Sequence, residues 1–242
     1  VRKLAPNRVE VIDCADSREF GLRRPFGISG VVLEAEAFDV QGNSLGKAEV
    51  RHTADLDWVV GIEKAMRYVV TFGPARGALR VRADLAVVPP GGTVTLEGAG
   101  ATFTCEDARV EGGTLQVPAD VPVGSSLWVK GEAAGRSGWT VLPVVPLVEV
   151  KVDPPVVRLP ASEAEVTLRG RIHPPAAGVT GATLSLSTPP WLVATPETFA
   201  VERDFTRTVK LSLKGAPEKS AGMLVLTVKA GDLSQEVSVP IW

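Results

Sequence analysis

Proline content and a two-residue alternation limit what this chain can fold into, and both are clearest in residues 144–160. Prolines at positions 146, 154, 155 and 160 exclude a helix there and hold the residues before them in an extended conformation. Between the first two of these prolines, Val148, Val150 and Val152 alternate with charged residues, as a half-buried strand requires. We interpret this stretch as a joint between bodies of β-structure.

Turn-forming glycines and prolines recur along all 242 residues, which contain 24 glycines and 19 prolines. Val87-Val88-Pro89-Pro90-Gly91-Gly92 reads as a second joint. Short alternating segments separated by turn residues are typical of all-β sandwiches. We therefore predict an all-β chain of tandem immunoglobulin-like β-sandwiches, with modules at residues 1–85, 86–145 and 146–242.

Two parts of the sequence resemble known immunoglobulin-like modules. Residues 90–100 (Pro-Gly-Gly-Thr-Val-Thr-Leu-Glu-Gly-Ala-Gly), 117–124 (Val-Pro-Ala-Asp-Val-Pro-Val-Gly) and 138–141 (Gly-Trp-Thr-Val) resemble the compact IPT/TIG type. Residues 187–193 and 207–213 (Ser-Thr-Pro-Pro-Trp-Leu-Val, Arg-Thr-Val-Lys-Leu-Ser-Leu) and 221–228 and 235–241 (Ala-Gly-Met-Leu-Val-Leu-Thr-Val, Gln-Glu-Val-Ser-Val-Pro-Ile) resemble domains found beside bacterial glycosidases and in cell-surface proteins. The resemblance implies this fold and an envelope or extracellular setting, and it implies no catalytic residues.

Composition narrows the classes of partner. The net charge of −2 lacks the basic excess with which proteins bind nucleic acid, and no apolar run approaches the ~20 residues of a membrane-spanning helix. The chain begins with Val, which fits a mature secreted protein, although a fragment would look the same. Scarce Cys and Met beside abundant Pro and Val favour a thermophilic source. We expect an extracellular or cell-envelope location.

Cys14 and Cys105 are the two cysteines, and they fall in different predicted modules. A disulfide between them would close a loop of about 90 residues and stabilise the fold by about 4 kcal/mol in the chain-entropy interpretation. The alternative is two buried thiols that pack as small apolar groups. Neither cysteine belongs to a Cys-x-x-Cys pair, which argues against a redox or zinc site.

The sequence contains no recognisable catalytic constellation. His52 and His173 are the two histidines, and neither belongs to a nucleophile elbow or a His-Glu-x-x-His motif. We place His52 at an exposed strand end and His173 in a turn before two prolines. The expectation is a protein that is not an enzyme and has no cofactor.

Calcium is the one metal for which the sequence offers weak candidates. Aspartate and asparagine oxygens in turns can bind this ion, although such residues ordinarily bond to their own backbone. None of the candidates follows the spacing of an EF-hand loop. They are Asp39, Asn43, Asp55, Asp57 and Asp153.

The five tryptophans divide into two groups. Trp58, Trp128 and Trp139 lie within apolar strand patterns, so we expect them in the interior. Trp191 follows two prolines at a corner and Trp242 ends the sequence, so either can stack on a sugar ring or pack on a neighbouring subunit. The alternative for these two is a plug at the end of a sandwich.

Strands near both ends of the sequence suggest a mode of assembly. The strand with Val9 and Val11 and the strand with Val237 and Val239 can each add to the sheet edge of a neighbour if they are unpaired. We expect a non-enzymatic structural or interaction protein, such as a subunit of a surface filament, layer or appendage, with other protein subunits or itself as partner. The alternative is a glycan-binding or accessory module set of a larger envelope enzyme.

Overall fold

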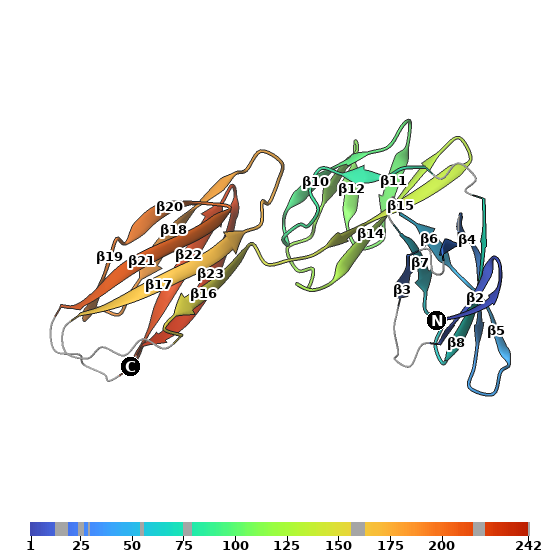
Figure 1. Ribbon diagram of the computed structural model, residues 1–242. Coiled ribbons are helices and arrows are strands. Elements are labelled where there is room, and N and C mark those ends of the chain that lie inside the picture. Colours follow the sequence, from blue (N-terminus) through green and yellow to red (C-terminus); the bar gives the residue numbers. More distant parts are fainter. Residues whose placement is uncertain are drawn as a thin grey trace. The chain divides into compact units, whose positions relative to one another are not determined.

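A computed structural model describes residues 1–12, 19–23, 27–28, 30–53, 56–74, 79–155, 163–214 and 221–241. Throughout these residues the regular structure is β-strand, arranged in six sheets whose strand pairs are antiparallel (Figure 1). The all-β, multi-sheet sandwich class predicted from alternation is confirmed. The described part of the chain has no helix that is long and apolar enough to cross a membrane.

Residues 2–73 supply two sheets that enclose one core. Val9, Val70 and Ala35 lie opposite one another on three neighbouring strands, and all three are fully buried. Val59 closes the core from the second sheet. The first sheet, in order of pairing, contains β1 (Arg2–Ala5), β2 (Arg8–Ile12), β8 (Arg67–Gly73), β4 (Val31–Phe38) and β5 (Ser44–Ala48), and the second contains β3 (Glu19–Leu22), β7 (Asp57–Val60) and β6 (Val50–His52).

Residues 82–143 supply two smaller sheets. Their strands alternate as predicted: Leu127 and Val129 are buried, whereas Trp128 and Lys130 between them are partly exposed. One sheet contains, in order of pairing, β12 (Arg109–Glu111), β13 (Thr114–Gln116), β10 (Thr93–Glu97) and β9 (Arg82–Ala83), and the other contains β11 (Thr102–Cys105), β14 (Ser126–Ala133) and β15 (Arg136–Pro143).

Residues 148–241 form a larger sandwich. Val166 and Leu168 of one sheet and Leu224 and Leu226 of the other are fully buried in a shared core, because every second residue of these strands points inward. The first sheet contains, in order of pairing, β16 (Val148–Asp153), β17 (Glu163–Ile172), β21 (Asp204–Leu213) and β19 (Leu192–Thr195), and the second contains β20 (Thr198–Glu202), β18 (Gly181–Ser187), β22 (Gly222–Ala230) and β23 (Leu233–Ile241).

The chain divides into two compact units that are not contiguous in sequence. Unit 1 comprises residues 1–83, 96–106 and 128–141, and unit 2 comprises residues 84–95, 107–127 and 142–242. The segment 86–145, predicted as a separate module, therefore contributes residues to both units. The predicted boundaries after residues 85 and 145 stay predictions.

Candidate interaction surfaces

His52 lies at the end of strand β6, as predicted, but its ring is partly buried and not exposed. Its Nδ1 lies 2.8 Å from Oδ1 of Asp57, whose other oxygen accepts a hydrogen bond from the backbone N–H of Val32 at 2.7 Å. Asp57 thus links β6, β7 and β4. Both of its oxygens have structural partners, so this calcium candidate serves to connect strands.

His173 is buried and not set in an open turn. It follows β17, its backbone N–H donates to the carbonyl of Leu147, and its Nε2 lies 3.2 Å from Oε1 of Glu149. Its Nδ1 has no hydrogen-bond partner among the described residues. Neither histidine contacts a serine, threonine or cysteine nucleophile in the interactions that the described residues make.

Of the remaining calcium candidates, Asp39 and Asn43 bond to each other within one turn. The Asp39 carboxylate accepts from the Asn43 side-chain N–H at 2.9 Å and from its backbone N–H at 2.8 Å. The side-chain bond from Asn43 lowers the pKa of Asp39 below its ordinary value, and backbone N–H groups of the turn add to this effect. Asp153 is exposed at the end of β16, and Asp55 lies outside the described residues. Over the described ranges, no three His, Cys, Asp or Glu side chains gather as a metal site.

The predicted disulfide stays a prediction. Cys105 is half-buried in β11, and Cys14 lies outside the described residues.

The strands predicted to add to a neighbour's sheet differ in their pairing. Val9 and Val11 lie in β2, which pairs with β1 on one side and β8 on the other, so β2 is a central strand and not an unpaired one. Val237 and Val239 lie in β23, which ends its sheet and pairs with β22 alone among the described strands. Val239 is buried and Val237 half-buried in the core. The side chains of all four valines thus pack inside the protein.

The tryptophans also depart from expectation. Trp191 packs on the core of the C-terminal sandwich, beside Pro189 and above Gly222, where an added Cβ would come within 3.1 Å of its ring. This position agrees with the plug that we considered, whereas Trp242 lies outside the described residues. The prediction that Trp58, Trp128 and Trp139 are interior residues is wrong. All three are only partly buried.

Two of these tryptophans contact one guanidinium group, and the third packs on one of the two. Cζ of Arg51 lies 4.8 Å from the ring centroid of Trp128 and 4.8 Å from that of Trp139. Trp58 meets Trp128 edge to face at 5.5 Å, and Trp128 meets Trp139 at 6.3 Å. We call Arg51, Trp58, Trp128 and Trp139 the Arg51 cluster. Sequence reasoning missed it because β6 and β7 are distant in sequence from β14 and β15.

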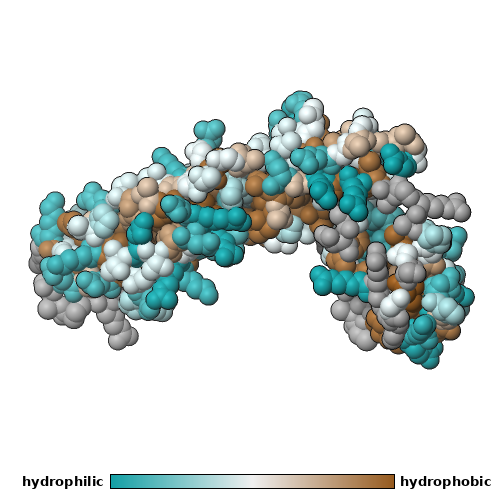
Figure 2. Space-filling view, turned by 45° about the horizontal axis from the view of Figure 1, so that its top comes forward, coloured by the Kyte–Doolittle hydropathy of each residue, from teal (hydrophilic) through white to brown (hydrophobic). Residues whose placement is uncertain are grey.

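Large aliphatic side chains are exposed on the sheet that begins at the N-terminus. Ile12 is 59% exposed, Met66 41% and Val40 73%, and Ile12 lies opposite Arg67, which lies opposite Phe38. The backbone N–H of Met66 donates to the carbonyl of Phe38. Hydrophobic residues are visible at the surface of this part of the chain in Figure 2. We call the surface formed by Ile12, Phe38, Val40, Met66 and Arg67 the Ile12 patch.

Charged residues flank this patch. Glu10 is buried on the outer face of the same sheet, 3.0 Å from Arg2 Nε and 3.3 Å from Arg67 Nη1. Cζ of Arg67 lies 4.5 Å from the ring centroid of Phe38. Arg67 thus carries a guanidinium into the patch while one carboxylate holds it in place. Asp39 supplies a carboxylate between Phe38 and Val40.

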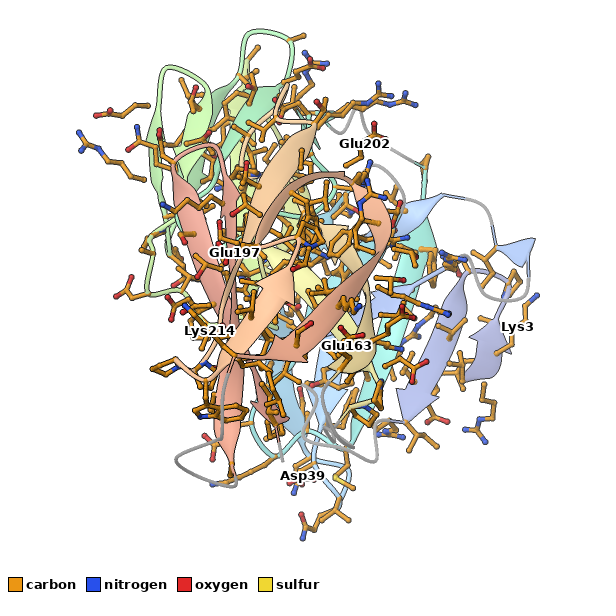
Figure 3. The ribbon with its side chains drawn as sticks, turned by 90° about the vertical axis from the view of Figure 1, so that its left-hand side faces the viewer. Lys3, Asp39, Glu163, Glu197, Glu202 and Lys214 are labelled. Atoms are coloured by element: carbon orange, nitrogen blue, oxygen red, sulfur yellow. The ribbon has the colours of Figure 1, made fainter. Side chains whose placement is uncertain are left out.

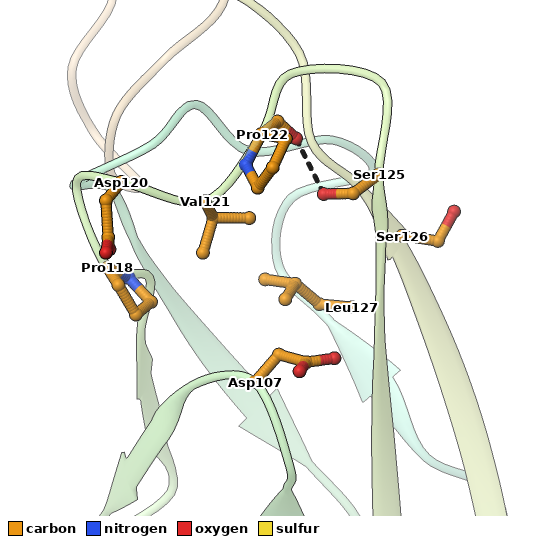
Figure 4. Close-up of a pocket in the computed structure, with 8 residues that line it drawn as sticks. All are labelled: Asp107, Pro118, Asp120, Val121, Pro122, Ser125, Ser126 and Leu127. Carbon is orange, nitrogen blue, oxygen red and sulfur yellow. Dashed lines mark hydrogen bonds between the residues drawn. The ribbon is translucent and has the colours of Figure 1, made fainter.

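A pocket lies in unit 2, where two loops and the start of β14 meet (Figure 4). Its volume is about 470 Å³, and the aliphatic side chains of Val121 and Leu127 point into it. Asp107 and Asp120 stand on its rim, and the hydroxyl of Ser125 donates to the carbonyl of Pro122 at 2.6 Å. The residues that line the pocket include no histidine and no cationic side chain.

Comparison with known proteins finds weak structural similarity and no similarity in sequence to a family or a curated protein. No protein-family profile and no curated protein matches the sequence. Among solved structures, the chain is similar to native α2-macroglobulin of Escherichia coli (TM-score 0.31, 11% identity, 99% of this chain and 23% of that one) and to domains 1–6 of the surface layer protein SbsC (0.30, 12%, 88% and 38%). It is also similar to the periplasmic chaperone SfaE (0.28, 10%, 38% and 56%). The chain covers little more than half of that chaperone, and these scores carry no conclusion about activity or partners.

Proposed function

We propose that this chain is a non-enzymatic structural or interaction protein of the cell envelope or extracellular space, built from immunoglobulin-like sandwiches, that associates with a second copy of itself through the Ile12 patch. The observation that carries the proposal is the exposure of Ile12 and Met66 beside Arg67 and Phe38 at one end of a sheet. Of the nine large hydrophobic side chains exposed among the described residues, seven belong to residues 1–66: Val1, Leu4, Ile12, Leu33, Val40, Leu45 and Met66.

Burial of such side chains by a partner is favourable, at about 25 cal/mol for each Å² of apolar surface removed from water. Exposed apolar patches with a polar rim mark interaction sites on soluble proteins. The exposed aliphatic side chains of the Ile12 patch therefore support a protein partner. The resemblance of residues 187–241 to cell-surface domains supports the location.

The charges beside the patch favour a second copy as the partner. A two-fold contact joins the same surface of two subunits, so it requires a surface that is complementary to itself. The Ile12 patch holds the Arg67 guanidinium, and Asp39 places a carboxylate beside Phe38. In a two-fold arrangement Arg67 of each subunit can face Asp39 of the other.

The nearby edge strand β1 has features that oppose strand addition, which favours contact through the face of the sheet. The edge strand β1 carries Lys3, whose side chain extends away from the ribbon in Figure 3. A lysine on an edge strand opposes pairing with another chain. The register of β1 against β2 is also irregular between Lys3 and Ala5.

Light scattering coupled to sizing tests self-association over a wide range of concentration. We expect the mass to rise from one copy towards two, and the double variant Ile12→Thr/Met66→Gln to raise the dissociation constant at least about tenfold. Threonine keeps the branched Cβ that suits a strand. Met223→Gln is the matched control, because Met223 is 47% exposed on β22 of the other unit. This control should leave the mass unchanged.

A chain that stays monomeric at every concentration overturns self-association, as does equal weakening by the variant and its control. The glycan-binding alternative stays a prediction. Loss of binding to a glycan array on Trp191→Ala, with the fold intact, would support the alternative in place of our proposal.

A further inference from the structure

The Arg51 cluster joins two sheets of unit 1. Arg51 and Trp58 lie directly opposite each other on β6 and β7, and Trp128 and Trp139 lie on β14 and β15. Leu127 and Val129 are buried on the inner face of β14, so Trp128 points to the outer face by alternation. The outer face of the β11–β14–β15 sheet therefore meets the β3–β7–β6 sheet through these four side chains.

Neighbouring residues hold the guanidinium where its faces are free to stack. Glu49 accepts from Nε of Arg51 at 3.1 Å and from Nη2 at 3.3 Å, and the Arg51 side chain is only 16% exposed. A bidentate carboxylate fixes the guanidinium plane and occupies one edge, which leaves the rest of the group for aromatic contacts. Cζ of Arg51 lies 4.8 Å from both the Trp128 and the Trp139 ring, and these rings are nearly perpendicular with centroids 6.3 Å apart, so they form a corner that holds the guanidinium.

Strand β3 packs against the third indole, that of Trp58. Gly21 on β3 lies opposite Trp58, and an added Cβ at Gly21 would lie 3.5 Å from the Trp58 ring. The indole thus lies across the glycine and is held beside Trp128. On the other side, Nζ of Lys130 lies 5.9 Å from the Trp139 ring.

We propose that the Arg51 cluster couples the opening of the β3–β7–β6 sheet to that of the β14–β15 hairpin, so that these segments, distant in sequence, unfold and refold as one cooperative body. A single cation–π contact shifts an equilibrium constant by about 2- to 30-fold, according to how well it is shielded from water. Arg51 makes two such contacts, and the edge-to-face tryptophan pairs add to them. The coupling does not depend on the proposed self-association.

Hydrogen exchange of the whole chain, read by mass spectrometry, tests the coupling. Arg51→Lys keeps the charge and loses the planar group that contacts two indoles. We expect exchange to accelerate at least about tenfold, and by the same factor, in β6–β7 and in β14–β15. Arg67→Lys is the matched control, since Arg67 also stacks on one ring, that of Phe38, but within a single sheet. It should accelerate exchange only in β2, β8 and β4.

The reciprocal variant keeps the test decisive if Arg51→Lys fails to fold. Trp139→Phe retains an apolar ring and weakens one stacked face, and it should accelerate exchange in β6–β7 on the far side of the cluster. In the double variant the two effects should be clearly non-additive. Acceleration confined to the mutated sheet, or effects that simply add, overturns the proposal.

Discussion

Asp39 shows how one residue acquires a perturbed acidity from hydrogen bonds within its own turn. Its lowered pKa arises first from the Asn43 side chain and then from backbone N–H groups. Because the folded pKa lies below the unfolded one, the stabilisation that this turn gains is present above the ordinary value of 3.8 and is lost as the pH falls through the lowered pKa.

The variant Asn43→Ala removes the main cause of this shift. We expect the pKa of Asp39, followed by carboxyl ¹³C chemical shifts, to return towards 3.8, because the largest stabilising bond to the carboxylate is gone. Gln41→Ala is the control, since the contribution of that residue comes from its backbone. An unchanged titration of Asp39 in Asn43→Ala would assign the shift to the backbone alone.

His173 leads to a prediction about stability. A buried polar atom without a partner costs about 1–3 kcal/mol, while the hydrogen bond between His173 and Glu149 contributes about 0.5–1.5 kcal/mol. His173→Leu fills a similar volume and should keep the free energy of unfolding within about 1 kcal/mol of the wild type or raise it. His173→Ala should lower it by about 2 kcal/mol, because a cavity remains.

Urea denaturation of the two variants distinguishes the cost of the unpartnered His173 nitrogen from the contribution of its bond to Glu149. Equal destabilisation by leucine and alanine would show that the bond to Glu149 outweighs the unpartnered nitrogen.

Among the strands, β15 depends on a glycine for close approach of the backbone. An added Cβ at Gly138 would lie 1.8 Å from the carbonyl oxygen of Leu79, in the segment whose N–H donates to the carbonyl of Ser137. We expect Gly138→Ala to lower the free energy of unfolding by about 1–3 kcal/mol, since backbone must move to relieve the contact.

Gly21→Ala is the matched control for this prediction. It makes the same change in another strand of the same unit, where the nearest atoms to the added Cβ lie at 3.4 and 3.5 Å. Thermal unfolding should leave this control close to the wild type. Equal effects of the two variants would mean that loss of strand glycine, and not the contact with Leu79, sets the stability.

At the scale of the whole chain, the near balance of charge makes a prediction about solubility. With a net charge of −2 at pH 7 and an isoelectric point near 5.8, repulsion between copies is weakest just below neutrality. Turbidity in low salt should therefore peak near pH 5.8 and fall on either side. A peak displaced by more than about one pH unit would show that a local patch, and not net charge, controls association.

The all-β class and most strand positions were predictable, because alternation in segments such as Val166 to Ile172 reports directly which face is buried. Residues 62–65 form a turn closed by a hydrogen bond from the Ala65 N–H to the Ile62 carbonyl, with Lys64 at a φ of 68°. Local composition cannot signal such a conformation in a lysine.

The candidate surfaces were much less predictable. Trp58, Trp128 and Trp139 sit in apolar segments, and apolar neighbours favour burial. Their position in the alternation places them on outer faces, where an arginine from another strand contacts Trp128. Contacts between strands so distant in sequence depend on tertiary structure, which one sequence does not contain. The central position of β2 was missed for the same reason, since its edge is covered by the preceding residues.

The division of unit 1 into three stretches of sequence has a consequence for how the protein is made. Residues 1–83 leave the ribosome long before Trp128–Val141, the last stretch that completes this unit. At a synthesis rate of about 5–20 residues per second, the delay is on the order of 3–12 s. Throughout that interval Arg51 and Trp58 lack the two indoles on which they later pack, so the nascent chain carries an unfinished aromatic surface. Its early residues must stay soluble, or be shielded by a chaperone, until the β14–β15 hairpin arrives.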